Sequence, residues 1–353
     1  MSDPKKVFIF APADETGESH ELLESNGCEL TLGDASWSTP QGNSEDQMAK
    51  MAEGAVALAG TSIRSSPITR KIMEAAPDLR IVAKYTIGVD DVDVDAATEM
   101  GILVTHAPTE SNWGGVAEGT MAIMLAILKR LRERDEQVKA GGWRDESHQG
   151  TFLGRRGDGY EGITIGIVGL GRIGTRLSEY LRPWRVRLIG NDPYVPLEHF
   201  EECGVQPVDL ETLLKESDVA TFHVVMTGET RNMVGARELA MMKPSAVLIN
   251  TSRGGVVNEA ALIDALDSGQ IRAAGIDVFE QEPLPSDSKL KELGDKVLLS
   301  PHMVSSNSGT GGLRPGIKWA TDSVLAALRG EVPDNVYNKD VIPAWTKRFG
   351  KSG

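Results

Sequence analysis

The stretch ITIGIVGLGRIGTRLSEYL, which begins at Ile163, constrains the fold more than any other part of the chain. An apolar run leads into Gly169, Gly171 and Gly174 in the pattern GxGxxG, and a segment of helical character follows. A second apolar run, VRLIGND, ends in Asp192, about 20 residues beyond the glycines, as the pattern requires. This order of strand, glycine turn, helix and strand predicts a βαβ unit that binds a dinucleotide.

Each part of this pattern has a physical task. The first glycine permits a tight turn, the second lets the backbone approach a pyrophosphate, and the third lets helix and strand pack closely. The helix N-terminus offers unpaired N–H groups to phosphates. Asp192 would bind ribose hydroxyls and repel a 2′-phosphate, and DPYVPLEHF contains no Arg or Lys, so NAD is favoured over NADP. We therefore expect these residues to contact NAD: Gly169, Gly171, Arg172, Ile173, Gly174 and Asp192.

Apolar runs alternate with helix-like segments along both halves of the chain, which predicts an α/β fold with parallel, doubly wound sheets. In the first half, strands are expected at 7–10, 55–60, 80–86 and 101–108, and the stretch 19–32 reads as a helix, a turn at Gly27 and a further strand. Six strand candidates follow Ile163. A long helix at 113–141 could bridge two domains, and 141–162 reads as loop. After a helix at 313–329, an irregular tail is expected.

Composition excludes several partners. The chain has 353 residues, and its net charge of −14 argues against nucleic acid or an anionic membrane as the main partner. Cys28 and Cys203 lie far apart and outside any metal-binding motif, which indicates a reducing compartment and no metal site. We expect a cytoplasmic protein, because no secretory leader is recognisable and no apolar run reaches about 18 residues.

Four chemically useful side chains follow predicted strands of the second half. They are Arg253, Asp277, Glu282 and His302. Because the carboxyl ends of parallel strands gather at one edge of a sheet, we expect these side chains to converge there. Oxidation of a 2-hydroxy acid requires a base for the proton, a role suited to histidine, and a carboxylate would fix its tautomer. Arginine binds a carboxylate through two hydrogen bonds.

The chain resembles the D-isomer-specific 2-hydroxyacid dehydrogenases from about residue 50 to 330. The motifs GLGRIG, NTSRGGVVNEAALIDAL, GIDVFEQEPLP and SPH carry the resemblance, with YTIGVDDVDVDAATEMGILVTHAPTESNWGGVAE. It implies that Arg253 binds the substrate carboxylate and carbonyl, that Glu282 partners the base, and that His302 is the acid/base. Asp277 would hold the nicotinamide carboxamide. The remaining expected contacts are His223, Thr251 and Ser252 with the cofactor, and Ile87, Gly88, Val89 and Asn112 with the substrate.

The resemblance also implies a discontinuous chain path. A flavodoxin-like substrate domain would comprise residues 1–107 and 303–353, and a Rossmann NAD domain residues 108–302. Dimers would form through the cofactor domain.

Several residues depart from the family pattern. Asn-x-Pro is replaced by His106-Ala-Pro108, and the Gly or Cys two residues before Gly88 is Thr86. The stretch from His223 to Thr227 lacks the usual proline. Met303-Val304 stands where glycines usually follow the histidine, and these bulkier residues could reshape the substrate pocket.

Two further cations bear on the substrate. If Arg64 and Lys84 both face the cleft, then with Arg253 they would favour a substrate with a second anionic group, such as a phosphate, a sulfonate or a second carboxylate. The alternative is that both side chains are simply solvated.

Two other functions stay open on the sequence alone. An enzyme of this fold acting on formate would lack the glutamate beside the histidine, so Glu282 speaks against it. An NAD-sensing scaffold of the corepressor type could keep the whole catalytic set. Turnover of 2-oxo acids separates the scaffold from the dehydrogenase.

Overall fold

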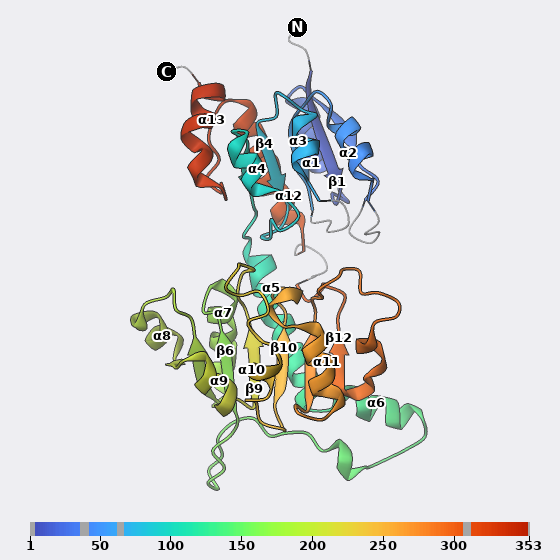
Figure 1. Ribbon diagram of the computed structural model, residues 1–353, viewed down its shortest axis with the longest axis vertical. Coiled ribbons are helices and arrows are strands. Elements are labelled where there is room, and N and C mark those ends of the chain that lie inside the picture. Colours follow the sequence, from blue (N-terminus) through green and yellow to red (C-terminus); the bar gives the residue numbers. More distant parts are fainter. Residues whose placement is uncertain (1–3, 36–41, 62–66, 306–311, 352–353) are drawn as a thin grey trace. The chain divides into compact units, whose positions relative to one another are not determined.

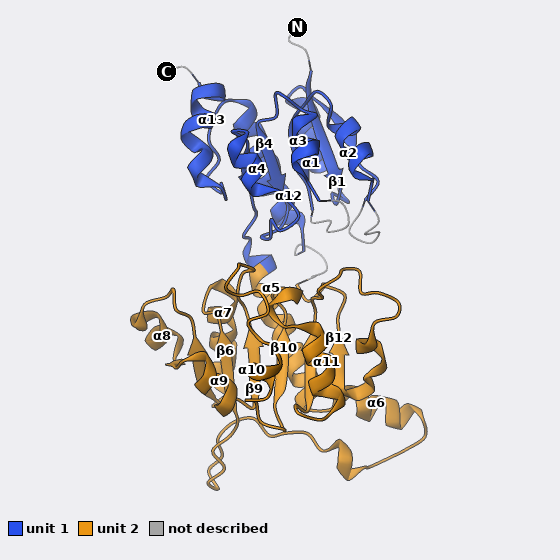
Figure 2. Cartoon of the chain, viewed as in Figure 1, with its two compact units in different colours: residues 1–112, 306–353 blue, residues 113–305 orange. Residues whose placement is uncertain are grey.

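The computed structural model describes residues 4–35, 42–61, 67–305 and 312–351. The chain forms two compact units, residues 1–112 with 306–353 (unit 1) and residues 113–305 (unit 2) (Figure 2). Unit 1 is thus built from two separate stretches of chain. The expected limits were 107/108 and 302/303, and the assignment of the substrate to unit 1 stays a prediction.

Unit 1 contains a five-stranded parallel sheet in the order β2-β1-β3-β4-β5. The strands are β1 (Lys5–Ala11), β2 (Cys28–Leu32), β3 (Ala55–Gly60), β4 (Ile81–Lys84) and β5 (Leu103–Thr105). This is the flavodoxin-like order, as predicted. Strands β3, β4 and β5 are almost wholly buried because helices cover both faces of the sheet (Figure 1).

Helices of unit 1 pack in two layers. They are α1 (Glu18–Ser25), α2 (Glu45–Ala52), α3 (Arg70–Glu74), α4 (Val94–Glu99), α12 (Arg314–Leu328) and α13 (Ile342–Phe349). One apolar cluster joins the sheet to α2, α3 and α4, and another joins it to α1, α12 and α13. The expected irregular tail is wrong: Trp345 of α13 is fully buried and donates a hydrogen bond from Nε1 to Arg80 O at 2.9 Å. These contacts of Trp345 with distant residues stabilise helix α13, which the local sequence does not predict.

Unit 2 contains a seven-stranded parallel sheet in the order β12-β11-β10-β9-β6-β7-β8. The strands are β6 (Thr164–Val168), β7 (Arg187–Asn191), β8 (Gln206–Pro207), β9 (Val219–Phe222), β10 (Val247–Asn250), β11 (Ala273–Ile276) and β12 (Val297–Leu299). This is the Rossmann order with one further strand, and its direction of winding reverses between β6 and β9. Only the two-residue β8 escaped prediction.

Helices of unit 2 flank this sheet. They are α5 (Glu110–Leu128), whose first turn belongs to unit 1, α6 (Leu131–Lys139), α7 (Arg172–Leu181), α8 (Leu197–Cys203), α9 (Leu210–Glu216), α10 (Ala236–Leu239) and α11 (Glu259–Asp267). The expected single helix at 113–141 is wrong. It is broken at Arg130, whose φ of 52° is left-handed and incompatible with a continuous right-handed helix. Between α6 and β6 the chain leaves the body of the unit as a long irregular arm (Figure 1).

Two negative findings concern the described parts of the chain. None of their helices is long and apolar enough to cross a membrane. Nor do their His, Cys, Asp and Glu side chains form a group of three or more that could hold a metal ion.

Candidate active site

The glycine turn after β6 is as tight as its sequence predicts. Gly169 has a φ of 91°, and a Cβ there would lie 2.7 Å from His223 O. A Cβ on Gly174 would lie 2.0 Å from Gly169 O, so any larger residue at position 174 would prevent helix α7 from packing this closely against the turn. By contrast, the space around Gly171 is open. No side chain caps the N-terminus of α7, so its first N–H groups remain available to phosphates.

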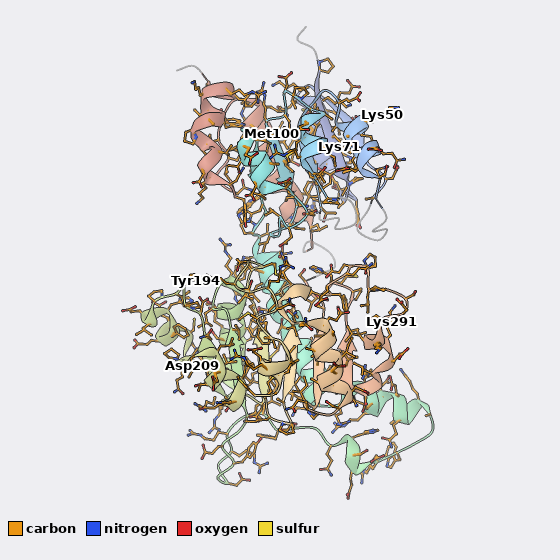
Figure 3. All side chains as sticks on the ribbon, viewed as in Figure 1. Lys50, Lys71, Met100, Tyr194, Asp209 and Lys291 are labelled. Carbon is orange, nitrogen blue, oxygen red and sulfur yellow. The ribbon has the colours of Figure 1, made fainter. Side chains whose placement is uncertain are left out.

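Asp192 joins the end of β7 to the glycine turn. Its Oδ2 accepts a hydrogen bond from Leu170 N at 2.8 Å, and its Oδ1 accepts one from Tyr194 N at 2.9 Å. Each carboxylate oxygen keeps a further lone pair, which suits a ribose hydroxyl. Tyr194, labelled in Figure 3, is exposed beside this turn. A shallow apolar cavity of about 440 Å³ adjoins Asp192 and includes Val195 and Leu197 in its wall.

His223 follows β9, on the other side of the point where the winding reverses. Its Nε2 lies 3.0 Å from Thr221 Oγ1, whereas its buried Nδ1 has no hydrogen-bond partner in the described structure. Burial lowers the pKa of the ring to about 3, so the imidazole is neutral at pH 7. An unpartnered buried nitrogen beside an uncapped helix and a glycine turn fits a site for a dinucleotide.

His302 and Glu282 are in contact, as the sequence anticipates. Glu282 Oε2 lies 2.8 Å from His302 Nδ1, and Glu282 Oε1 accepts a hydrogen bond from Phe279 N at 2.9 Å. The Glu282 side chain is 13% exposed and that of His302 is 40% exposed. Within the described residues Nε2 of His302 has no hydrogen-bond partner, so the carboxylate fixes one ring nitrogen and leaves the other open.

Asp277 holds the loop that carries the histidine. Its buried carboxylate accepts hydrogen bonds from Met303 N at 3.0 Å and Val304 N at 3.2 Å. Burial raises the pKa of Asp277, while hydrogen bonds and the neighbouring His302 oppose that rise. His302 itself has a φ of 55°, in the left-handed region. The two backbone contacts made by Asp277 support that conformation, a task that the sequence did not reveal.

Met303 and Val304 occupy different surroundings. A Cβ added to Gly119 of α5 would lie 2.1 Å from Val304 Cγ2, so the valine packs directly against this helix. Met303 is 44% exposed. Of the two bulky residues after the histidine, Met303 is therefore the one left to shape the surroundings of the base.

The loop after β10 is fixed by buried polar contacts. Asn250 Oδ1 accepts hydrogen bonds from Ser252 N at 3.1 Å and Ser252 Oγ at 2.8 Å, and Asn250 Nδ2 donates one to Arg253 O at 2.9 Å. Thr251 Oγ1 lies 2.9 Å from Thr120 Oγ1. Buried Thr251 and Ser252 thus shape the turn, and the Arg253 side chain donates from Nη1 to Ser252 O at 2.7 Å.

The four predicted chemical groups of unit 2 share one sheet edge. Arg253 follows β10, Asp277 and Glu282 follow β11, and His302 follows β12. These three strands are neighbours in a parallel sheet. Their carboxyl ends are therefore adjacent, as expected from the sequence.

Unit 1 presents a backbone site after β4. The N–H groups of Ile87, Gly88 and Val89 have no acceptor in the described structure. His106 Nδ1 lies 3.2 Å from Ile87 O, and Thr86 Oγ1 donates to Gly88 O at 3.2 Å. His106 and Thr86, two of the residues that depart from the family pattern, thus hold this loop, and three successive N–H groups suit a carboxylate.

Lys84 does not lie where the second-anion hypothesis needs it. Its side chain is 0% exposed, its Nζ lies 2.5 Å from Asp91 Oδ2, and it donates to Thr61 O at 3.1 Å. Its charge is therefore engaged by a carboxylate inside unit 1. Asp91 was not identified from the sequence as the partner of Lys84. An opposite charge at the other end of the same loop is a signal that could have indicated this pairing.

Arg64, Asn112 and Trp113 are the remaining candidates for the substrate site or its surroundings. Arg64 lies outside the described residues. Asn112 lies half-buried in the first turn of α5, where its N–H donates to Thr109 O at 3.0 Å. The ring of Trp113 is covered by the guanidinium of Arg176, 4.9 Å from its centroid. Trp113 thus packs on helix α7, the helix that opens at the glycine turn.

Known proteins resemble this chain in sequence and in structure. Residues 121–304 match the family model of the D-isomer specific 2-hydroxyacid dehydrogenase, NAD binding domain. A glyoxylate reductase from Korarchaeum cryptofilum is 41% identical over 285 residues, which are 80% of this chain and 82% of that protein. A D-3-phosphoglycerate dehydrogenase from Methanocaldococcus jannaschii is 38% identical over 80% of this chain, but only 52% of its own length is matched.

A D-lactate dehydrogenase from Aquifex aeolicus, solved with NAD and lactic acid, has a TM-score of 0.78 and 27% identity. That likeness covers 96% of this chain and 98% of the other. The comparisons confirm the predicted fold, the NAD cofactor and the reaction class. The chain belongs to the D-isomer specific 2-hydroxyacid dehydrogenase family, whose members are NAD-dependent oxidoreductases.

Proposed function

We propose that this chain interconverts a small 2-oxo acid and its D-2-hydroxy acid, with His302 as the acid and base. When bound, NAD exchanges the hydride with the substrate. His302 gives a proton from Nε2 to the carbonyl oxygen during reduction and takes it back during oxidation. The observation that carries this proposal is the 2.8 Å contact between Glu282 Oε2 and His302 Nδ1, which leaves Nε2 open.

Two further groups would hold the substrate. Arg253 would bind its carboxylate and polarise its carbonyl, because a guanidinium donates parallel hydrogen bonds to planar oxyanions. The free N–H groups of Ile87, Gly88 and Val89 in unit 1 have the donor geometry that a carboxylate requires. Each charge-assisted hydrogen bond contributes about 1.5–3 kcal/mol.

Asp277 holds the loop that carries the proposed base, His302. Its contacts with Met303 N and Val304 N hold the loop in which His302 adopts its left-handed conformation. A contact with the nicotinamide carboxamide, expected from the family resemblance, would use the remaining lone pairs of the same carboxylate.

The substrate is proposed to be short and to carry one negative charge. The burial of Lys84 against Asp91 supports this choice, since it removes one of the three cations on which a second anionic group depended. The 41% identity to a glyoxylate reductase also supports it. The 38% identity to a phosphoglycerate dehydrogenase favours the competing, phosphorylated substrate, for which Arg64 and Arg253 remain.

A substrate panel tests this choice. NADH oxidation is followed with glyoxylate, pyruvate, hydroxypyruvate and 3-phosphohydroxypyruvate, and kcat/KM is compared. We expect the three monoanions to give the higher values. A clear preference for the phosphorylated acid would contradict the proposal. An absence of turnover with every acid, combined with tight NADH binding, would favour an NAD-sensing scaffold.

We propose that the chain forms a homodimer through unit 2. The arm between α6 and β6 supports this, because it carries Trp143 at 73% exposure and Phe152 at 52% exposure. Exposed aromatic side chains on an extended segment are typical of a surface that a partner covers. Light scattering of the wild type and of Trp143→Ser tests it: a monomeric wild type would contradict the proposal.

A cytoplasmic location remains our proposal for the protein. The two cysteines, Cys28 and Cys203, are free and buried, which suits a reducing compartment.

A further inference from the structure

A second cavity lies at the opposite edge of the sheet of unit 2 from His302. Ala273 begins β11, and Lys296 directly precedes β12, so both mark the amino ends of strands. His302 follows the carboxyl end of β12. The cavity has a volume of about 200 Å³, and its wall is formed by Ile127, Arg130, Glu133, Arg272, Ala273, Asp295 and Lys296. We call it the amino-edge cavity.

Arg272 is the unusual member of this wall. Its Nε is buried and has no hydrogen-bond partner, and its guanidinium forms no ion pair with a described residue. A buried donor without a partner is unfavourable, and a guanidinium carries five N–H donors that are ordinarily used. Burial and the nearby charge of Arg130 lower the pKa of Arg272, and the charge of Glu133 opposes this effect only in part.

The other charged groups of the wall are already engaged. Arg130 Nη1 lies 3.4 Å from Glu133 Oε1 and 3.7 Å from Asp295 Oδ2, so one arginine faces both carboxylates. Lys296 Nζ donates to Asp267 O at 3.0 Å. Three cations and two carboxylates therefore line the cavity, and Arg130 contacts both carboxylates. Lys296 and Arg272 have no carboxylate partner among the described residues, and Arg272 also lacks a hydrogen bond there.

The break between α5 and α6 contributes to the same wall. Arg130 adopts its left-handed conformation there, and no side chain caps the N-terminus of α6. The uncapped N–H groups of a helix start add a partial positive charge on this side of Arg130.

We propose that the amino-edge cavity binds a small oxyanion carrying more than one negative charge, with Arg272 as its principal ligand. A phosphate or a short dicarboxylate has the required charge and acceptor geometry, because a guanidinium donates two parallel hydrogen bonds to either group. The cavity is smaller than the roughly 300–1,000 Å³ of ordinary small-molecule sites, which restricts the ligand to a few heavy atoms. This site is distinct from the one proposed for NAD and the 2-oxo acid.

Calorimetric titration of the full chain with inorganic phosphate tests the proposal. The protein is first saturated with NADH, so that the phosphate-binding turn at α7 is filled. We expect one phosphate to bind per chain, and Arg272→Met to raise its Kd about tenfold or more, the loss of a charge-assisted hydrogen bond. A parallel titration with malonate shows whether a dicarboxylate is preferred over phosphate.

The matched control is Arg134→Met. Arg134 lies exposed on α6 and donates to His148 O at 2.8 Å, outside the cavity wall. This variant should bind phosphate as the wild type does. Equal binding by Arg272→Met and the wild type would overturn the proposal, as would an absence of binding by both phosphate and malonate.

Thermal unfolding provides a second measurement. In buffer without multivalent anions, Arg272→Met should melt at the wild-type Tm or above it, because the change removes a partly buried charge that lacks a partner. Phosphate should raise the Tm of the wild type and not that of Arg272→Met. A lower Tm for Arg272→Met in anion-free buffer would show that Arg272 serves the fold, and would overturn the proposal.

Discussion

The buried pair of Lys84 and Asp91 offers a sharp test of how the loop after β4 is held. Their side chains are 0% and 2% exposed and are joined at 2.5 Å. Removing either partner leaves a buried charge without compensation, which costs about 3–5 kcal/mol. Replacing both by apolar residues of similar size is close to neutral in comparable cases. We therefore expect Lys84→Met and Asp91→Leu each to destabilise unit 1 strongly, and the double variant to recover most of that loss.

The magnitude is large against the total stability of a domain, which is about 5–15 kcal/mol. Urea unfolding followed by tryptophan fluorescence measures the change, since Trp345, one of the six tryptophans of the chain, is fully buried in unit 1. Since each single variant costs about 3–5 kcal/mol and the double variant recovers most of the loss, the double-mutant cycle should give a coupling free energy of at least about 3 kcal/mol, the upper end for contacting residues. Single variants that cost less than about 1 kcal/mol, the level of an exposed pair, would refute the reasoning.

The same variants test the proposed role of the loop. Lys84 ends β4 and Asp91 closes the stretch that contains Ile87, Gly88 and Val89. Loss of either partner should raise KM for the 2-oxo acid, because the three N–H groups lose their fixed positions. NADH affinity should stay within about twofold, since NAD is held by unit 2. A variant that loses NADH affinity instead would show that the pair acts elsewhere.

Three other predictions concern the residues around the glycine turn and the loop that carries His302. The neutral His223, with its pKa lowered to about 3, stabilises the fold above pH 6.5 and loses that stability as pH falls. Between pH 7.5 and 5.5, the free energy of unfolding of His223→Gln should therefore fall less than that of the wild type, by up to about 1.4 kcal/mol. An equal fall in both proteins would contradict this. Gly174→Ala places a Cβ 2.0 Å from Gly169 O, so fluorescence titration should show NADH binding weakened at least about tenfold, and binding as tight as that of the wild type would contradict this. Gly119→Ala should lower kcat in steady-state assays, because its Cβ would lie 2.1 Å from Val304 Cγ2 and 2.3 Å from Val304 O and so displace the loop that carries His302; a wild-type kcat would contradict this.

Much of the fold could be predicted because its signals are local. The glycine pattern and Asp192 lie in one continuous βαβ unit, and the alternation of apolar runs with helices specifies a parallel sheet. The shared position of Arg253, Glu282 and His302 followed from topology alone, since carboxyl ends of parallel strands meet at one edge.

Other features depend on contacts between distant parts of the chain. The buried state of Lys84 depends on Asp91 and on packing around β4, and a lysine in a sequence looks the same whether it is solvated or buried. Helix α13 depends on the burial of Trp345 against the sheet of unit 1. The break at Arg130 depends on a single backbone conformation that no glycine or proline marks. Asp277 looks like a cofactor ligand in sequence, and only the structure shows its bonds to Met303 N and Val304 N.

The role of His302 is tested most directly by single-turnover hydride transfer. NADH-saturated wild type and His302→Gln are mixed with the best 2-oxo acid of the panel, and the decay of NADH absorbance is followed. The account predicts that the variant binds NADH as the wild type does but transfers hydride about 10²–10⁴-fold more slowly, the contribution of a general acid. Glu282→Gln should also be slower, because the ring loses the partner that fixes its tautomer. Hydride transfer by His302→Gln at the wild-type rate would contradict the central claim.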